Sequence, residues 1–519
     1  MDTLLPLLDR HLPALVLAGI VIAGGYAWPR FLSYLRYCKI PVLNTKYDGP
    51  PENFLFHSAK VYEEGYRTRR NDVHRIIAPD GEHVVIPNRY LDELRERPDD
   101  EVDVLTAFMK VMENDYIHLF PCHHNTHIAN SVVKKELTRS LAKINPALSR
   151  AVAETVASEM PAECDSGWTP VNINAVLLRM VAIISGHVFV GPELCRRPEY
   201  LDAAVNFTTD ITMAVPIVKR WTKLIRPLAK YFEPQLAKVQ AHRARMRDFL
   251  APVIAERKAK KARGDTMPED TLQWMLDKTE AEGITDATEL TNMQLLLTMA
   301  AIHTTTLTTT FILHDMVARP DVVEACRQEI KHVLAASGDD GSMSTHALFN
   351  MKLVDSVMRE SQRMNPPFLD SFRRYTLKPV TLRDGTFIPA GCLIEAANKA
   401  VLMDPDIYPD PATFDPYRFV RLRTNADAPD PLAYKNREQY QFVSVTKENM
   451  SFGFGRHACP GRFFAANEIK LILANLLLNY DLRLAAAGEG GLAKDVVLGS
   501  GVGPDPSRVI LFRKARARA

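Results

Sequence analysis

The sequence has no excess of charge of either sign. Its 64 basic and 62 acidic residues give a formal net charge of +2 at pH 7. Proteins that bind nucleic acid concentrate positive charge, so the composition predicts neither a nucleic-acid partner nor an acidic substrate. The chain also lacks the low hydrophobicity that is typical of disorder, because 46% of its 519 residues are hydrophobic. We therefore expect a globular protein with a large buried core.

Paired cysteines are missing as well. The seven cysteines are widely spaced and include no Cys-x-x-Cys pair, which argues against a disulfide framework and against a structural zinc site. No Gly/Ser-rich linker, charge block or repeat divides the chain after its N-terminus. These absences predict one large catalytic domain, over residues 41–519, in a reducing compartment.

Long hydrophobic runs are absent except at the N-terminus. Residues 12–28 (LPALVLAGIVIAGGYAW) carry no charge and reach the shorter end of the length that spans a membrane. A secretory signal peptide is the alternative, but Asp2 and Asp9 precede the run and bulky residues end it. A buried helix is less favoured because the run has no polar face. We interpret residues 1–40 as a membrane anchor and linker, and the basic residues that follow the run predict a cytosolic catalytic domain.

Helical periodicity dominates the middle of the chain. Apolar residues recur at helical spacing over residues 92–318, with Pro and Gly between the segments. Much of a Pro-rich stretch, residues 404–431, is expected to be irregular. The predicted fold is mainly α with small β-sheets. The expected strands lie in two hairpins, residues 75–87 and 380–389, and in residues 480–484 and 509–512.

A cysteine lies between a glycine-rich turn and a helical pattern. Cys459 follows the turn within residues 451–480, and at a helix entrance free N–H groups and the helix dipole stabilise a thiolate, the form that binds metal. Pro460 suits the first helical position, and nearby glycines allow close approach of a flat ligand. From these residues alone, a buried structural thiol is the more common interpretation.

The full string around this cysteine resembles the haem-binding signature of the cytochrome P450 family, Phe-x-x-Gly-x-Arg-x-Cys-x-Gly. Phe452, Gly455, Cys459 and Gly461 match it at every spacing, whereas His457 replaces the usual arginine. The resemblance implies that Cys459 ligates the iron of haem b. It also implies that His457 contacts a haem propionate, since a histidine can donate a hydrogen bond.

Two further strings resemble family motifs in the expected order. Glu360-Ser361-Gln362-Arg363 is similar to the Glu-x-x-Arg motif, and its spacing puts the two charges on one helix face. The later string around Arg418 is similar to the Pro-x-Arg-Phe motif. The resemblance implies a buried network of Glu360, Arg363 and Arg418 that holds the haem-binding core together. It also implies that Arg374 reaches a haem propionate, with Arg373 as the alternative.

Residues 295–316 form an apolar stretch rich in threonine. A buried strand is one interpretation, but the segment resembles the family's oxygen-handling helix, with the motif Ala/Gly-Gly-x-Asp/Glu-Thr-Thr. Thr304 and Thr305 match its threonines, and Thr304 falls at the residue that supports proton delivery. Ala301 replaces the usual glycine and His303 the usual acid. Histidine can transfer protons near neutral pH, so we expect His303 to be either a proton relay or a structural residue.

Taken together, the resemblance implies a haem-thiolate monooxygenase that inserts one oxygen atom from O2 into a hydrophobic small molecule. Electrons would come from NADPH through NADPH-cytochrome P450 reductase, with cytochrome b5 as an optional second donor, at the endoplasmic reticulum membrane. A terpenoid or related fungal metabolite is the first expectation for the substrate, and a steroid or fatty acid the second. A non-oxygenating rearrangement and a haem-binding sensor are the alternatives.

The resemblance also implies where substrate and reductase bind. Arg456 and Arg462, near the cysteine, are expected to help dock an acidic reductase. The expected pocket residues are apolar and come from four distant segments, namely Phe108, Met112, Met299, Ile302, Phe368, Leu369 and Val502.

Overall fold

The computed structural model describes residue 16 and residues 27–28, 31–47, 53–121, 125–337, 342–485, 495–505 and 507–515. Most of the predicted anchor, residues 12–28, lies outside these residues. Within the part of the chain that is described, one helix, Ala287–Val317, is long and apolar enough to cross a membrane. More than half of its most apolar window is buried against the rest of the protein, which is the environment of a core helix.

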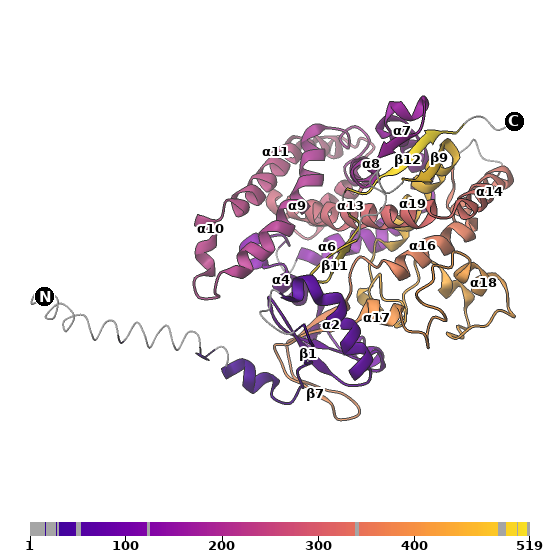
Figure 1. The fold of residues 1–519 in the computed structure, drawn as a ribbon. Helices are drawn as coiled ribbons and strands as arrows, with labels where there is room; N and C mark the ends of the chain where they lie inside the picture. Colours follow the sequence, from indigo (N-terminus) through magenta and orange to yellow (C-terminus); the bar gives the residue numbers. More distant parts are fainter. Residues whose placement is uncertain are drawn as a thin grey trace, which may run out of the picture.

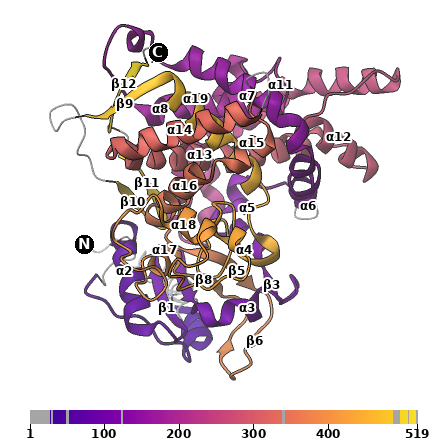
Figure 2. The same ribbon diagram turned by 90° about the vertical axis from the view of Figure 1, so that its right-hand side faces the viewer.

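Helices make up most of the molecule, and the predicted mainly α fold with small sheets is confirmed (Figure 1). Figure 2 shows most helices gathered in one half, with the largest sheet, α2 and α17 in the other. The helices are α2 (Asn53–Arg69), α3 (Leu91–Leu94), α4 (Val104–Val111), α5 (Asn114–Ile117), α6 (Thr126–Ser131), α7 (Thr138–Glu159), α8 (Ile173–Phe189), α9 (Pro198–Arg220), α10 (Ala229–Phe232), α11 (Pro234–Ala262), α12 (Thr271–Ala281), α13 (Ala287–Val317), α14 (Pro320–Ser337), α15 (Thr345–Asn350), α16 (Lys352–Met364), α17 (Asn398–Leu402), α18 (Arg418–Thr424) and α19 (Arg462–Asn479).

The threonine-rich stretch is helical, as the motif predicted, and the strand interpretation is wrong. Helix α13 begins at the N-cap Asp286, whose side chain accepts a hydrogen bond from the Thr288 N–H. Within the helix, the Thr309 hydroxyl donates to the Thr305 carbonyl at 2.8 Å, and other threonines do the same one turn apart. These bonds satisfy hydroxyl groups that are buried. A long helix that is apolar nearly all round can therefore run through the core.

Four small sheets are described, and both predicted hairpins are present. The first, β1–β2, turns before Gly81, which has a φ of 134°, a value that disfavours any residue with a β-carbon. The strands are β1 (His74–Ala78), β2 (Gly81–Val85), β8 (Leu393–Ala396), β5 (Ser371–Thr376) and β3 (Val102–Asp103), in that order in the largest sheet, with β6 (Val380–Thr381) and β7 (Phe387–Ile388), β10 (Val496–Leu498) and β11 (Gly501–Gly503), and the sheet β4 (Thr169–Val171), β12 (Ile510–Lys514) and β9 (Tyr480–Leu484). The last two match the strands predicted near the C-terminus.

Strand β5 contains an irregularity that bears on the site. Its pairing with β8 changes register between Ser371 and Arg374. Between them, Phe372 has a φ of 56°, in the left-handed region that non-glycine residues rarely adopt. The Phe372 ring is buried and packs against Phe454, with 6.4 Å between the ring centroids. The strand therefore carries a bulge that is fixed by packing.

Much of the Pro-rich stretch is irregular, as predicted, but it includes one short helix. Residues 418–424 form the short helix α18. Its apolar Phe419 and Leu422, three residues apart, are buried on one face, and the helix packs against α16. Burial of an apolar face by tertiary packing stabilises a helix that is too short to form alone.

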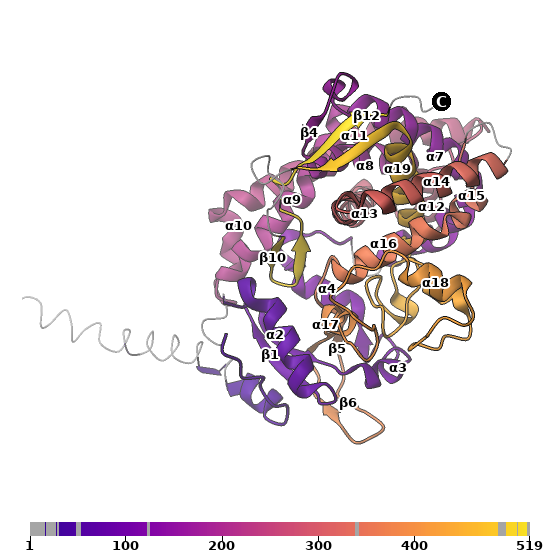
Figure 3. The ribbon, with the colours of Figure 1, turned by 45° about the vertical axis from the view of Figure 1, so that its right-hand side comes forward.

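The helices around α13 position the site. Helix α13 packs against α8, α9, α11 and α16, while α19 packs against α7 and α13. Figure 3 shows α13 almost end-on, with α16 below it. The largest hydrophobic cluster is built mainly from these helices, so α13 and the start of α19 are both held by the core.

Candidate active site

A cavity of about 370 Å3 lies between α13, the loop before α19, strand β5 and helix α4. It brings together segments far apart in the sequence, including Thr304 of α13 and Cys459 of the loop. Most of its wall is apolar. The lining residues are Val104, Phe108, Ala300, Thr304, Thr305, Thr308, Gln362, Pro367, Phe368, Asp370, Ser371, Phe372, Arg373, Arg374, Asn398, Phe442, Ser451, Phe452, Gly453, His457, Cys459, Pro460, Ala465 and Ile469.

The Cys459 loop is held by backbone hydrogen bonds. The Cys459 N–H donates to the Phe452 carbonyl at 2.7 Å. Burial raises the pKa of the Cys459 thiol, and backbone N–H groups of Gly461 and Arg462, with the Arg462 charge, partly offset that rise. The helix starts at Arg462, with Gly461 as its N-cap, so the prediction that Pro460 is the first helical residue is wrong. A turn at residues 460–461 separates the cysteine from the helix, and this turn directs N–H groups at the sulfur.

The glycines of the signature differ in what they do. Gly453 lines the cavity and has a φ of 78°. Gly455 does not line it. Its φ is 74°, and a β-carbon there would lie 2.9 Å from the Arg95 Cβ, so the chain's own packing requires this glycine. Gly461 also lies outside the lining, and a β-carbon there would make an ordinary contact with Val133.

Phe452 and His457 both line the cavity. The Phe452 ring packs edge-on against Phe442, with 5.2 Å between centroids. His457 Nε2 lies 2.8 Å from Asp99 Oδ1, and the Arg456 guanidinium reaches the same carboxylate at 2.7 Å. Burial lowers the pKa of His457, and the Asp99 contact partly offsets this. The positive charge of Arg456 is therefore balanced by Asp99, and the same carboxylate contacts the Nε2 atom of His457.

The adjacent arginines of β5 have different partners. Arg373 is ion-paired with Asp370 at 2.8 Å and also donates to the Ser500 hydroxyl. Arg374 donates to the backbone carbonyls of Arg373, at 2.7 Å, and Phe454, at 3.5 Å. No carboxylate among the described residues forms an ion pair with Arg374. Burial lowers the pKa of Arg374 to about 10. Arg374 is thus a buried cation on the cavity wall with capacity for an anion.

Thr304 and Thr305 line the cavity, whereas His303 does not. The Thr304 hydroxyl donates to the Ala300 carbonyl at 2.7 Å. His303 Nε2 lies 3.1 Å from the Val205 carbonyl of α9, so this nitrogen carries a proton and donates it. Burial lowers the pKa of His303, an effect that the Val205 hydrogen bond partly offsets. This geometry favours the structural interpretation of His303 over the proton relay.

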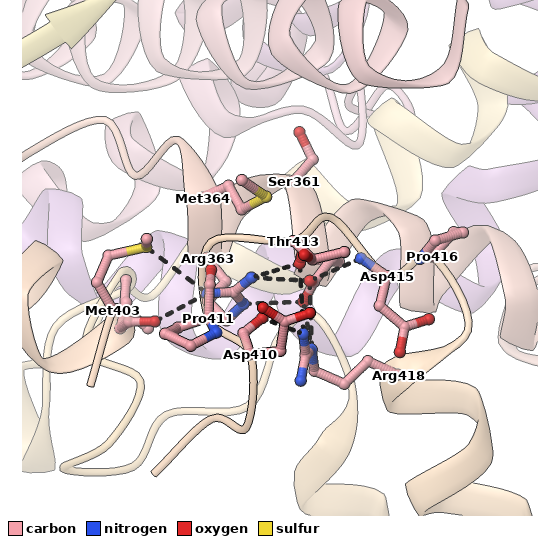
Figure 4. Close-up of polar contacts among 12 residues, drawn as sticks. Ser361, Arg363, Met364, Met403, Asp410, Pro411, Thr413, Asp415, Pro416 and Arg418 are labelled. Atoms are coloured by element: carbon pink, nitrogen blue, oxygen red, sulfur yellow. Dashed lines mark hydrogen bonds and ion pairs between the residues drawn. The ribbon is translucent and has the colours of Figure 1, made fainter. Parts of the chain in front are cut away.

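Glu360, Arg363 and Arg418 form a buried ion network (Figure 4). Arg363 donates through two nitrogens to the Glu360 carboxylate, at 2.8 and 2.9 Å, and Arg418 Nε approaches both oxygens at 3.2 Å. The Asp415 N–H donates to the same carboxylate at 3.0 Å. The remaining N–H groups of the two arginines donate to backbone carbonyls of the irregular chain, at Leu402, Pro409, Asp410, Pro411 and Thr413. The network ties α16 to the loop that precedes α18.

The expected pocket is only partly correct. Of the seven apolar residues predicted, Phe108 and Phe368 line the cavity. The other five do not, because their side chains pack into the hydrophobic clusters. Sequence reasoning missed Thr308, although its position one helical turn after Thr304 is a signal that predicts the same face. It also missed Asp370 on the wall, for which the sequence gives no signal, and it named Arg373 only as the alternative to Arg374.

These residues fit a haem. A thiol with N–H groups directed at it suits a metal ligand. The buried guanidinium of Arg374, which lacks a carboxylate partner, suits a propionate. The apolar wall around Phe452 and Ala300 suits a porphyrin. A cysteine loop facing a threonine-bearing helix across such a cavity is the arrangement of a haem-thiolate protein.

Comparison with known proteins gives the family. The cytochrome P450 family profile matches residues 47–495. The chain is 35% identical over 460 residues to the cytochrome P450 monooxygenase braC of Annulohypoxylon truncatum, covering 88% of each chain. It is 32% identical over 506 residues to the cytochrome P450 monooxygenase paxP of Penicillium paxilli, covering 94% of this chain and 92% of that one. The chain belongs to the cytochrome P450 family and is an oxidoreductase of its monooxygenase class.

A solved structure has the same fold. The retinoic acid-bound cyanobacterial CYP120A1 superposes with a TM-score of 0.68 at 18% sequence identity, covering 92% of this chain and all of that one. Members of the family carry haem and receive electrons from a redox partner. The family resemblance predicted from the four motifs is therefore confirmed.

Proposed function

We propose that this enzyme hydroxylates or epoxidises a terpenoid or related hydrophobic metabolite, with haem b ligated by Cys459 and electrons from NADPH through a reductase. The observation that carries the proposal is that the Cys459 thiol and the Thr304 hydroxyl line one apolar cavity. When bound, the haem supplies the reductive activation of dioxygen that inserts one oxygen atom into a C–H or C=C bond.

The residues on the cysteine side hold the ligand and the propionates. N–H groups of Gly461 and Arg462 stabilise the Cys459 sulfur as a thiolate. Arg374 supplies the charge for one propionate because no described carboxylate neutralises it. His457 lies on the same wall, and because Asp99 contacts its Nε2, we assign the contact with a propionate to its Nδ1. The Glu360, Arg363 and Arg418 network keeps the scaffold in place.

Thr304 lies on the α13 wall of the cavity, and we assign it the control of proton supply. Its hydroxyl donates to the Ala300 carbonyl, so in this position its oxygen accepts a hydrogen bond from water. Turning the hydroxyl toward the cavity would let it donate a proton to the reacting oxygen. Thr305 lies beside it on the wall. We assign His303 a positioning role, since its N–H is occupied by the Val205 carbonyl of α9.

The substrate class follows from the wall. Phe108, Phe368 and Phe372 present apolar surface to the cavity, and burial of apolar area is the main source of binding energy in such a site. The cavity also contains hydroxyl groups from α13, which can orient one polar group of the substrate. A rigid hydrocarbon skeleton with few oxygen atoms, as in terpenoids, suits this wall better than a strongly polar compound.

We infer that the enzyme is held at the endoplasmic reticulum membrane by the segment within residues 1–40. The segment between α9 and α11 carries exposed apolar side chains. This segment and residues 31–47 lie toward the same side of the molecule (Figures 1 and 3). The basic residues Lys223 and Lys230 flank these side chains and suit anionic lipid headgroups. The exposed apolar side chains are Leu224, Ile225, Leu228, Tyr231 and Phe232.

The redox partner is proposed to bind on the cysteine side. Val133 contacts the position of a β-carbon on Gly461, and the neighbouring Lys134, Lys135 and Arg139 are exposed. This basic surface suits an acidic NADPH-cytochrome P450 reductase, and cytochrome b5 would use the same charge. Arg456, predicted for this role, is paired with Asp99, while Arg462 donates to the Cys459 carbonyl.

The test combines a spectrum with turnover. The reduced, carbon monoxide-treated holoenzyme should give a thiolate-type Soret band, which Cys459→Ser should lose and the control Cys195→Ser, at another buried thiol, should keep. With reductase, a terpenoid panel should stimulate NADPH oxidation and yield products heavier by one oxygen atom. Absence of the thiolate band would contradict haem ligation by Cys459. A normal band with no oxygenated product from any apolar compound would contradict the proposed activity.

A further inference from the structure

The cavity wall contains a guanidinium that the protein uses only in part. Arg373 donates through Nε and Nη2 to the Asp370 carboxylate, and Nη2 also donates to the Ser500 hydroxyl. Its third nitrogen, Nη1, keeps some exposed surface and has no acceptor among the described residues. The Arg373 side chain lines the cavity and is 16% exposed, whereas that of Asp370 is 1% exposed. Arg373 therefore has an N–H donor available for a molecule in the cavity.

The Arg373 side chain is held firmly in place. Ser500, its second partner, lies in the turn between β10 and β11, and the Ser500 carbonyl accepts a hydrogen bond of 2.8 Å from the Leu369 N–H. Behind the pair, the carboxylate of Glu395 lies 3.9 Å from the Arg373 Nε and has no exposed surface. A donor that is already fixed by such contacts loses little conformational entropy when it binds a ligand.

A threonine of α13 has similar unused capacity. The hydroxyls of Thr304, Thr309 and Thr310 each donate to the carbonyl four residues earlier. Thr308 lines the cavity and is 7% exposed, but its hydroxyl has no partner among the described residues. It lies one turn after Thr304 on the same face of the helix. Thr305 shares this property and lies beside Thr304, so Thr308 is the free hydroxyl one turn further along the wall.

The charges around Arg373 decide what kind of group it can bind. Asp370, at 2.8 Å, already balances its positive charge, and Glu395 adds a second carboxylate. A carboxylate on a ligand would meet these like charges in a poorly solvated place, which is unfavourable. A neutral oxygen atom can accept from Nη1 without this penalty. The wall also offers an acceptor, because no described residue donates to the buried Oδ1 of Asn398. A hydroxyl, which both accepts and donates, suits these groups best.

We propose that Arg373 and Thr308 bind a hydroxyl group that the substrate already carries, so that the enzyme oxidises a terpenoid alcohol rather than a hydrocarbon. Nη1 of Arg373 donates to the hydroxyl oxygen, and the Thr308 oxygen accepts a hydrogen bond from it. A hydroxyl fixed on this wall orients the skeleton and thereby selects the carbon that is oxidised. An earlier hydroxylation, or the addition of water to a carbocation, must then supply the substrate. This inference rests on the proposed function and names the substrate class more closely.

The experiment uses imidazoles with a linear tail, which bind the haem iron of the holoenzyme and shift its Soret band. At each tail length from about four to twelve carbons, three ends are compared, namely methyl, hydroxyl and carboxylate. The measured quantity is the hydroxyl preference, which is the Kd of the methyl ligand divided by that of the hydroxyl ligand. We expect this preference to rise about 10-fold at one or two lengths, where the hydroxyl reaches Arg373. The carboxylate ligands should show no such maximum.

Two variants remove the proposed contacts. Asp370→Leu combined with Arg373→Met removes both charges of the pair and leaves neither unpaired, and Thr308→Val keeps the shape of the side chain without its hydroxyl. The maximum should disappear in the double variant and fall at least about threefold in Thr308→Val, while the Kd of the methyl ligands stays within about threefold. Thr309→Val, at a threonine that is bonded within its own helix and does not line the cavity, is the matched control and should keep the maximum.

The outcomes separate this role from others. A preference that shows no maximum in the unmodified enzyme, or a maximum that persists in both variants, would overturn the proposal. A larger maximum for the carboxylate ligands would also overturn it. Haem transfer to apomyoglobin as fast in the double variant as in Arg374→Met would make Arg373 a propionate ligand instead. If the double variant does not fold, Thr308→Val alone decides. Loss of the thiolate band in the unmodified enzyme would count against the proposed function, and the imidazole titrations do not depend on that band.

Discussion

Arg373 and Arg374 are neighbours in strand β5, but only Arg373 has a carboxylate partner. The Arg373 guanidinium pairs with Asp370, whereas Arg374 donates to two backbone carbonyls and lies over the Phe372 ring, 4.4 Å from its centroid. This difference assigns them separate tasks: Arg373 is committed to Asp370, and Arg374 can bind an anion.

Loss of the Arg374 charge should weaken haem retention. A hydrogen bond to a charged group contributes about 1.5–3 kcal/mol, so Arg374→Met should speed haem transfer to apomyoglobin by about 10-fold or more. Lys378→Met, which removes an exposed pair with Asp100, is the control and should stay within about twofold. A normal transfer rate for Arg374→Met would exclude Arg374 as a propionate ligand.

The buried network predicts different outcomes for two arginines of one helix. Arg418→Met leaves Glu360 with one partner fewer in the interior, and breaking such a pair costs about 3–5 kcal/mol. Arg421→Met removes an exposed pair with Asp415 and should cost less than about 1 kcal/mol. Thermal unfolding, with haem content measured alongside, compares them. Equal losses in the two variants would contradict the special role of the network.

Thr304 and His303 should differ in coupling. Positioned proton donors typically contribute about 100-fold or more to the step that they serve. Product formed per NADPH consumed is a ratio of two competing outcomes, so Thr304→Ala should lower it by at least about 10-fold and release hydrogen peroxide instead. His303→Gln should keep coupling within about twofold, because the His303 ring faces α9. Product, NADPH and peroxide are measured in one assay. A loss of coupling in His303→Gln equal to that in Thr304→Ala would reassign the relay to His303.

Glu468 predicts a pH-dependent effect on stability. Burial raises the pKa of this carboxyl to about 8, with a partly offsetting hydrogen bond from Ser185 at 2.8 Å. The folded enzyme therefore keeps a proton that the unfolded chain releases near pH 4.5. Stability falls as pH rises between these two values, by up to about 1.4 kcal/mol per pH unit from this group, and no further above pH 8.

Glu468→Gln cannot ionise and avoids this loss. Its free energy of unfolding should exceed that of the unmodified enzyme at pH 8 and match it at pH 4.5, as measured by urea denaturation. Glu163→Gln, at an exposed acid, should show no such pH-dependent difference. A Glu468→Gln variant that is less stable at both pH values would mean that the carboxylate is ionised in the fold.

Sequence motifs predicted the parts of the site that depend on local spacing. The Glu360–Arg363 pair is three residues apart on one helix, and Thr304 and Cys459 lie in strings whose spacing is specific, so their convergence in one cavity could be expected from the family. The two small hairpins were predictable from their Asp-Gly turns. The predicted start of α19, Pro460, lies two residues before the observed start, Arg462. Proline favours the first position of a helix, but here Pro460 and Gly461 form a turn instead.

Other features depend on contacts between distant segments. The direction of His303 is set by α9, nearly 100 residues away, and the partner of Arg373 is decided by the shape of β5. Neither leaves a local pattern. A series of ion pairs crosses three strands and reaches a helix, and each member alone is an ordinary charged residue of the sequence. Its members are Arg373, Glu395, His83, Asp80 and Lys219. Tertiary packing determined these features, as it did the short helix α18.

Phe372 has left-handed backbone angles, and because of them strand β5 can present two positive charges to one cavity. In a regular strand successive side chains point to opposite faces, so two consecutive arginines could not both reach one cavity. The bulge removes this alternation, and Arg373 and Arg374 both line the wall. The two positions can then change independently in evolution: Arg373 can vary together with Asp370, while Arg374 is kept for the cofactor. The cost is a strained backbone of about 1–2 kcal/mol at Phe372, whose ring also packs against the Arg374 guanidinium.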